Sequence, residues 1–311
     1  GLNALGAATV GHTNVAIGKD AMLGVTTASA TGNVAIGQLA MCGVAATEGD
    51  HNVAIGGYAM AYALTTGNDN VAVGRNSMDA LTTGNCNVAI GRHALGASTT
   101  SCLNVAIGQL AMGGAVTTGI NNVAIGQSSM DALTSGIGNI GIGPNALGTS
   151  TTGNYNVAIG VTTMGGADTT GIDNIAIGKT TMDALTTGIC NIAIGIDALG
   201  ASTTGCLNIA IGQTALGGAD TTGINNIALG TNTMDALTTG FNNVAIGVNA
   251  LTTSTTGCYS IAIGSNAMGS ADVTGIDNVA IGHNTMDALT SGICNVAIGT
   301  NALGASTTGC K

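Results

Sequence analysis

The sequence predicts an all-β fold, a parallel β-solenoid (β-roll) in which about seventeen rungs of 17–19 residues stack on one another. Three repeated features predict it. A short segment reads Asn-Val-Ala-Ile-Gly or a close variant, a Met or Leu follows eight residues after its Asn, and a Thr-Thr-Gly-like turn leads to the next Asn. Self-similarity at a fixed period of this length is typical of solenoids.

The Asn-Val-Ala-Ile-Gly segment is the predicted strand of each rung. It occurs seventeen times, and from the copy at Asn70 onward the copies begin 17, 17 and 18 residues apart, in that order. This makes a superrepeat of 52 residues built from three rungs. Residues 1–311 therefore form one continuous repeat array, which we expect to be an excerpt of a longer fibre.

Within each rung we count positions from the Asn, which is position 0. Val or Ile at positions 1 and 3 alternates with Ala at position 2, and Gly at position 4 is invariant. Alternation with period two and β-branched residues is typical of a short strand. The Gly at position 4 is expected to adopt a backbone angle that other residues avoid, or to leave room at a corner.

Stacking supplies the core that a single rung lacks. One rung has too little apolar surface to offset the entropy of ordering about 17 residues, at about 1–2 kcal/mol each. In a stack each strand pairs with the same strand about 4.8 Å above and below. We expect the Val and Ile side chains to point inward with the Met/Leu column, and the Asn side chains to form an amide ladder.

The opposite side of each strand is then expected to be smooth, because it carries Ala and Gly. Such a strip allows another backbone to approach closely, and we interpret it as a candidate chain–chain interface in a homo-oligomer; the alternative is a plain solvent face. The interface candidates are Ala106, Ala124, Ala158, Ala176, Ala193 and Ala210.

The strand segment followed by an Ala-Met or Ala-Leu pair resembles the head repeats of trimeric autotransporter adhesins, the YadA-like head. Similar Thr-Thr-Gly arrays occur in phage tail fibres and other virion-surface proteins. The resemblance covers essentially the whole chain, although the rungs are longer than the usual head repeat. It implies a left-handed β-roll, a homotrimer and an adhesive role toward a host-surface or matrix receptor.

The eight Cys residues contain no zinc-type spacing, but six of them form pairs that are 16 residues apart. Two such residues lie one rung apart and one position offset, which places their Cα atoms roughly 6 Å apart and within disulfide range. We predict rung-to-rung disulfides, with free thiols as the alternative; Cys42 and Cys258 have no partner. If the disulfides form, the protein folds in an oxidising compartment. The pairs are Cys86 and Cys102, Cys190 and Cys206, and Cys294 and Cys310.

A Thr-Thr pair recurs in nearly every turn. A Thr column with a spacing of about 4.8 Å resembles the surface of ice-binding solenoids, although those surfaces use two parallel columns on a flat face. The alternative is turn chemistry, in which the hydroxyls satisfy local backbone groups. The candidate ladder comprises Thr82, Thr83, Thr186, Thr187, Thr238 and Thr239.

The composition and the absence of known motifs argue against nucleic-acid binding, membrane binding and catalysis. A net charge of −10 and five aromatic residues argue against nucleic-acid and anionic-membrane binding. The four His are scattered, and the Asp of each Met-Asp-Ala-Leu block lies three rungs, or about 14 Å, from the next. We therefore predict no enzyme activity, no cofactor and no metal site.

The leading prediction is an extracellular structural or adhesive fibre segment, such as a surface adhesin head or a virion tail-fibre shaft. An ice-binding solenoid is the first alternative, and it depends on the Thr ladder. The second alternative is an extracellular filament subunit that assembles through its open ends.

Overall fold

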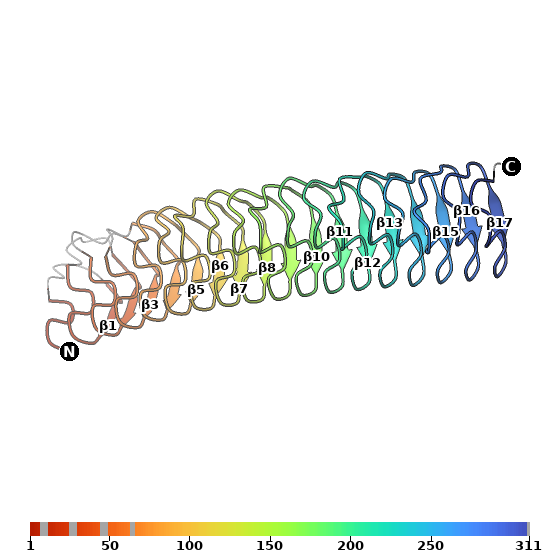
Figure 1. Ribbon diagram of the computed structural model, residues 1–311. Coiled ribbons are helices and arrows are strands. Elements are labelled where there is room, and N and C mark those ends of the chain that lie inside the picture. Colours follow the sequence, from red (N-terminus) through yellow and green to blue (C-terminus); the bar gives the residue numbers. More distant parts are fainter. Residues whose placement is uncertain (7–11, 25–29, 44–48, 63–65, 310–311) are drawn as a thin grey trace. The chain divides into compact units, whose positions relative to one another are not determined.

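The computed structural model describes residues 1–6, 12–24, 30–43, 49–62 and 66–309, and it confirms the predicted parallel β-solenoid. Seventeen strands of three residues each account for its regular structure, and the described residues contain no helix. The chain divides into two compact units, Gly1–Tyr155 and Asn156–Lys311. Within each unit the strands lie side by side, joined by loops (Figure 1).

The strands of the first unit are β1 (Val15–Ile17), β2 (Val34–Ile36), β3 (Val53–Ile55), β4 (Val71–Val73), β5 (Val88–Ile90), β6 (Val105–Ile107), β7 (Val123–Ile125) and β8 (Ile140–Ile142). Those of the second unit are β9 (Val157–Ile159), β10 (Ile175–Ile177), β11 (Ile192–Ile194), β12 (Ile209–Ile211), β13 (Ile227–Leu229), β14 (Val244–Ile246), β15 (Ile261–Ile263), β16 (Val279–Ile281) and β17 (Val296–Ile298).

Neighbouring strands pair in register, so that like residues stack on like residues. In the second unit Ile192 of β11 pairs with Ile209 of β12, and the Ala and Ile that follow keep the same register. The first unit has the same arrangement, as in the pairing of Val88 with Val105. Each position of the repeat therefore becomes a column that runs along its unit.

The two faces of the sheet are the reverse of our expectation. Ala at position 2 is completely buried in almost every rung, while Val and Ile at positions 1 and 3 are half-buried or exposed. Alternation places these residues on opposite faces but does not decide which face is inside. The interior is narrow, and the buried Met or Leu at position 8, such as Met182, fills it together with Ala. The column of small Ala side chains thus packs against the column of large Met and Leu side chains.

The predicted Asn ladder is present, and it lies in the core. The side-chain oxygen of Asn208 accepts hydrogen bonds from the backbone N–H of Asn226 at 2.9 Å and from its side-chain amide at 3.1 Å. The same amide also donates to the Gly240 carbonyl oxygen at 2.8 Å. Because buried polar groups are costly unless they are hydrogen-bonded, this ladder is what allows Asn to share the inner face with Ala.

Each rung also bends through left-handed backbone at positions that are not glycine. In the rung of Asn174, Thr180 has φ of 53° and Met182 has φ of 51°. Such angles cost roughly 1–2 kcal/mol for an ordinary residue. Rung-to-rung backbone hydrogen bonds oppose that cost: the Met182 N–H donates to the Ala198 carbonyl oxygen at 3.0 Å.

The invariant Gly at position 4 has both predicted properties, a backbone angle that other residues avoid and a corner without room for a side chain. Gly178 has φ of 138°, and a Cβ there would lie 2.6 Å from the carbonyl oxygen of Gly195 in the next rung. No side chain fits at this corner without moving the backbone of the neighbouring rung.

Candidate functional site

The most extensive surface feature of each unit is the outer side of its sheet, which we call the Val/Ile face. It consists of the side chains at positions 1 and 3 of every strand. Every strand residue is Val, Ile, Ala, Gly or Leu, so no charge or hydrogen-bonding side chain interrupts this face. At position 3, four isoleucines of the second unit are 36–40% exposed, and those of several other rungs are half-buried; the four are Ile177, Ile194, Ile211 and Ile246.

In the second unit a further apolar column runs beside the strands, at two residues before the Asn; in the first unit the same position also carries polar residues such as Asp50, Asn68 and Asn85. An isolated parallel bridge between Cys206 and Ile224 shows that this column also stacks from rung to rung. Six of the isoleucines at this position are 36–43% exposed. They are Ile120, Ile172, Ile189, Ile224, Ile276 and Ile293. Contiguous exposed apolar surface of this extent is typical of an interaction surface rather than of a face turned to solvent.

The predicted Ala interface is wrong, because its residues are inside the solenoid. All six side chains are fully buried, with no exposed surface, so none can meet another chain. They are Ala106, Ala124, Ala158, Ala176, Ala193 and Ala210. One signal in the sequence indicates the correct side: Ala is nearly constant, as an interior column packed against Met requires, whereas Val, Ile and Leu interchange at positions 1 and 3.

The Cys columns have the predicted one-rung, one-position offset. The Leu103 N–H donates to the Asn85 carbonyl oxygen at 3.0 Å, so Cys102 stacks on Asn85, the neighbour of Cys86. The Asn85 N–H in turn donates to the Cys102 sulfur at 3.3 Å. The cysteines of the predicted pairs that the structure describes are free thiols. Cys310 lies outside the described residues. The free thiols are Cys86, Cys102, Cys190, Cys206 and Cys294, together with Cys42 and Cys258.

The disulfides therefore remain a prediction for oxidising conditions. On exposure to oxygen or a small disulfide, we expect Cys190 and Cys206 to lose both thiols together, since register places them on adjacent rungs. Maleimide labelling followed by mass spectrometry counts the remaining thiols. Cys206→Ser should leave Cys190 reactive. Both thiols staying reactive in the oxidised wild-type chain, or cross-links between chains, would contradict the prediction.

The candidate Thr ladder divides into two columns with different roles. The first Thr of each pair is half-buried, and its hydroxyl donates to a backbone carbonyl in the next rung: Thr82 to Thr99 at 2.8 Å and Thr186 to Thr203 at 3.0 Å. Thr238 does the same toward Thr255 at 2.9 Å. The second Thr of each pair is exposed; these are Thr83, Thr187 and Thr239. Each turn therefore offers solvent one column of hydroxyls, and the other column performs the turn chemistry that we gave as the alternative.

Three aspartates of the Met-Asp-Ala-Leu blocks, Asp131, Asp183 and Asp235, lie against glycines of the preceding rung. The Asp131 carboxylate accepts backbone hydrogen bonds from Gly114 and Gly113, and Asp235 accepts one from Gly218. One oxygen of each carboxylate is buried and has no hydrogen-bond partner. Burial raises the pKa of both Asp131 and Asp235, and the glycine N–H groups lower it to a smaller extent.

This arrangement predicts a pH dependence. Because the pKa of Asp131 and Asp235 is higher in the fold than in the unfolded chain, the fold binds more protons. Their contribution to stability is therefore present at acid pH and is lost as the pH rises from about 4 through the raised pKa values. The double variant Asp131→Asn/Asp235→Asn should be more stable than wild type at pH 7 by less than about 1 kcal/mol, since water screens half-exposed groups. Thermal unfolding between pH 3.5 and 7 measures the difference.

Asp220 provides the matched control for this prediction. Its carboxylate is exposed and accepts hydrogen bonds from the Thr203 N–H at 2.8 Å and from the Thr203 hydroxyl at 2.9 Å. Asp220→Asn should destabilise the fold at pH 7. An Asp131→Asn/Asp235→Asn variant that loses stability at pH 7 as this control does would contradict the burial argument.

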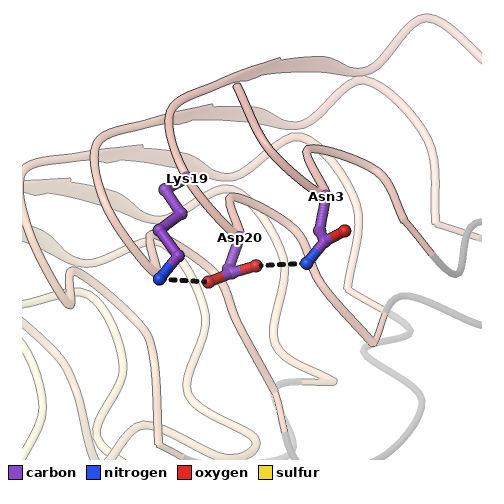
Figure 2. A network of polar contacts seen from close by, with 3 residues as sticks. All are labelled: Asn3, Lys19 and Asp20. Atoms are coloured by element: carbon purple, nitrogen blue, oxygen red, sulfur yellow. Dashed lines mark hydrogen bonds and ion pairs between the residues drawn. The ribbon is translucent and has the colours of Figure 1, made fainter.

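Charged and metal-ligating groups are sparse on the described surface. Among the described residues, the Lys19 ammonium group and the Asp20 carboxylate form an ion pair at 3.9 Å. The side-chain amide of Asn3 donates a hydrogen bond to the same carboxylate at 3.0 Å (Figure 2). No group of three or more His, Cys, Asp or Glu side chains that could hold a metal ion occurs among these residues. His12, His51 and His283 are exposed and lie on separate rungs.

Comparisons with known proteins leave the chain without an assigned family. No family model matches the sequence, and no curated protein matches it either. In the part of the chain that the structure describes, no helix is long and apolar enough to cross a membrane.

Proposed function

We propose that this chain is a segment of an extracellular structural or adhesive fibre, in which copies of the chain pack together through the Val/Ile face. The observation that carries the proposal is that two apolar columns, built of Val and Ile with Leu229 as the exception, are half-buried or exposed on the sheet of each unit. The interface that we first assigned to Ala thus moves to the opposite side of the same strands.

The size of the Val/Ile face fits this role. With two side chains per rung, each about one-third exposed, one unit offers on the order of 1,000 Å² of apolar surface, compared with about 800 Å² per partner in a standard interface. Stiff β-branched residues lose little side-chain entropy on packing. A face of this kind also matches itself, because every rung repeats the same two columns.

A homotrimer is the assembly we propose, on the strength of the resemblance to YadA-like head repeats. Three chains that turn their Val/Ile faces toward a common axis bury all three faces and leave the turns outside. The exposed Thr column and the Asp side chains at the turns, such as Asp220, then provide a polar surface facing solvent or a receptor. The extracellular location rests on the same resemblance and on the predicted disulfides.

Electron microscopy of the purified protein tests the fibre proposal. We expect particles wider than a single solenoid, and we expect the solution to show no thermal hysteresis on freezing. Thermal hysteresis shown by single solenoids would contradict the proposal and favour the ice-binding alternative.

A further inference from the structure

Rungs two and three, which begin at Asn33 and Asn52, differ from the later rungs in the loop after the strand. In the rungs from Asn70 onward, position 9 carries Asp, Gly or Thr, and position 10 carries Gly, Ala, Ser or Thr. In rung three, position 10 is instead Tyr62 and position 6 is Tyr58; in rung two, position 9 is Cys42. Departures from an otherwise regular repeat are where a site is expected, because the fold itself does not require them.

These residues form an apolar pocket on the outside of the solenoid. It has a volume of about 180 Å³ and is lined by Leu39, Cys42, Tyr58, Ala61 and Tyr62. The rings of Tyr58 and Tyr62 are stacked, with centroids 5.6 Å apart and an interplanar angle of 16°. Tyr62 is 59% exposed, so a large apolar ring remains in contact with water beside the pocket.

The dimensions of the pocket define the size of a ligand. An apolar cavity of about 150 Å³ holds one benzene molecule, so this pocket accommodates one ring or a small fused ring system. Tyrosine walls favour an aromatic ring, because offset or edge contacts between aromatic rings add to the stabilisation that area burial alone gives.

The charges around the pocket define the ligand's polarity. Burial, and then the negative charge of Asp20, raise the pKa of the Cys42 thiol. Lys19 and Asn3 hold the Asp20 carboxylate in place (Figure 2). The residues that line the pocket include no cationic side chain that could pair with an anion, so the pocket favours a neutral ligand.

We infer that the pocket between rungs two and three binds a small neutral aromatic molecule of about the size of indole, with its ring against Tyr62 and its edge against the Cys42 thiol. The site is separate from the Val/Ile face, since its side chains come from positions 6 to 10.

Protection of Cys42 from alkylation tests this inference. The native chain is treated with iodoacetamide at alkaline pH with increasing indole, and the modified cysteines are quantified by mass spectrometry. We expect indole to slow alkylation of Cys42 at least about fivefold in a saturable way, as occupancy of a specific site requires. Cys86, an exposed thiol of the same chain, should react at an unchanged rate. Benzoate, which is anionic, should protect neither residue.

Substitutions at exposed tyrosines complete the design. Tyr62→Ala should abolish the protection of Cys42, whereas Tyr155→Ala, at a tyrosine with similar exposure, should leave it intact. Tyr62→Phe keeps the ring and should keep the protection, so it tests the site even if Tyr62→Ala perturbs the fold. The inference is overturned by an absence of protection up to the solubility of indole, by equal protection of Cys86, or by protection that persists in Tyr62→Ala.

Discussion

Replacing Asn226 by Leu is expected to lower the free energy of unfolding by about 3–5 kcal/mol, because it removes one member of the buried amide ladder. The Asn226 amide donates to Asn208 and to the Gly240 carbonyl oxygen, at 3.1 and 2.8 Å. Its oxygen accepts from the N–H and the side-chain amide of Asn243, both at 3.1 Å. Leu makes none of these bonds and leaves the Gly240 carbonyl and the Asn243 N–H buried without these partners.

Asn225→Leu is the matched control, one residue away. Asn225 is exposed and has φ of 58°, and Leu207 already occupies the same column with φ of 59°. Leucine is therefore compatible with the backbone there, and we expect a cost of about 1 kcal/mol or less. Thermal unfolding followed by circular dichroism compares the two variants. Equal stabilities for Asn226→Leu and Asn225→Leu would show that the ladder does not hold the rungs together.

The second large effect concerns association rather than folding. The double variant Ile177→Lys/Ile211→Lys places two charges on the Val/Ile face of the second unit, on β10 and β12. Burying an unpaired ammonium group costs several kcal/mol, so we expect chain–chain affinity to fall by at least about a hundredfold. Both side chains are more than one-third exposed in the single chain, so the fold should persist.

Thr204→Lys/Thr239→Lys adds the same charge to exposed turn positions and serves as the control. This variant should associate as the wild type does. Size-exclusion chromatography with circular dichroism separates lost association from lost fold. Undiminished association of Ile177→Lys/Ile211→Lys would mean that the Val/Ile face is not the interface.

The sequence predicts those features of the fold that depend on residue identity at a constant or nearly constant position. The Asn column has to satisfy its own amides, and stacking in register is the arrangement that does so; the ladder at Asn208 and Asn226 follows. Gly at position 4 was predictable for the same reason, since Gly178 occupies a backbone angle and a corner that no side chain tolerates.

Which face is inside was not predictable from alternation alone. The outcome depends on the opposite wall of the rung, and that wall is shaped by left-handed residues such as Thr180 and Met182, whose intrinsic preferences argue against that conformation. Backbone hydrogen bonds between rungs impose this left-handed conformation. These bonds form only when rungs stack, so the sequence of a single repeat does not indicate them. The sequence did not predict the pocket at Tyr58 and Tyr62 for another reason. The pocket lies in rungs two and three, where the spacing of the repeat is irregular.

The mass of the assembled protein in solution tests the central claim, that copies of this chain associate through the Val/Ile face. Light scattering coupled to size-exclusion chromatography measures this mass. Because one chain has a mass of 29.8 kDa, we expect a mass close to three times that value for the wild-type protein. A mass equal to a single chain at every concentration would contradict it and would leave the Val/Ile face turned to solvent.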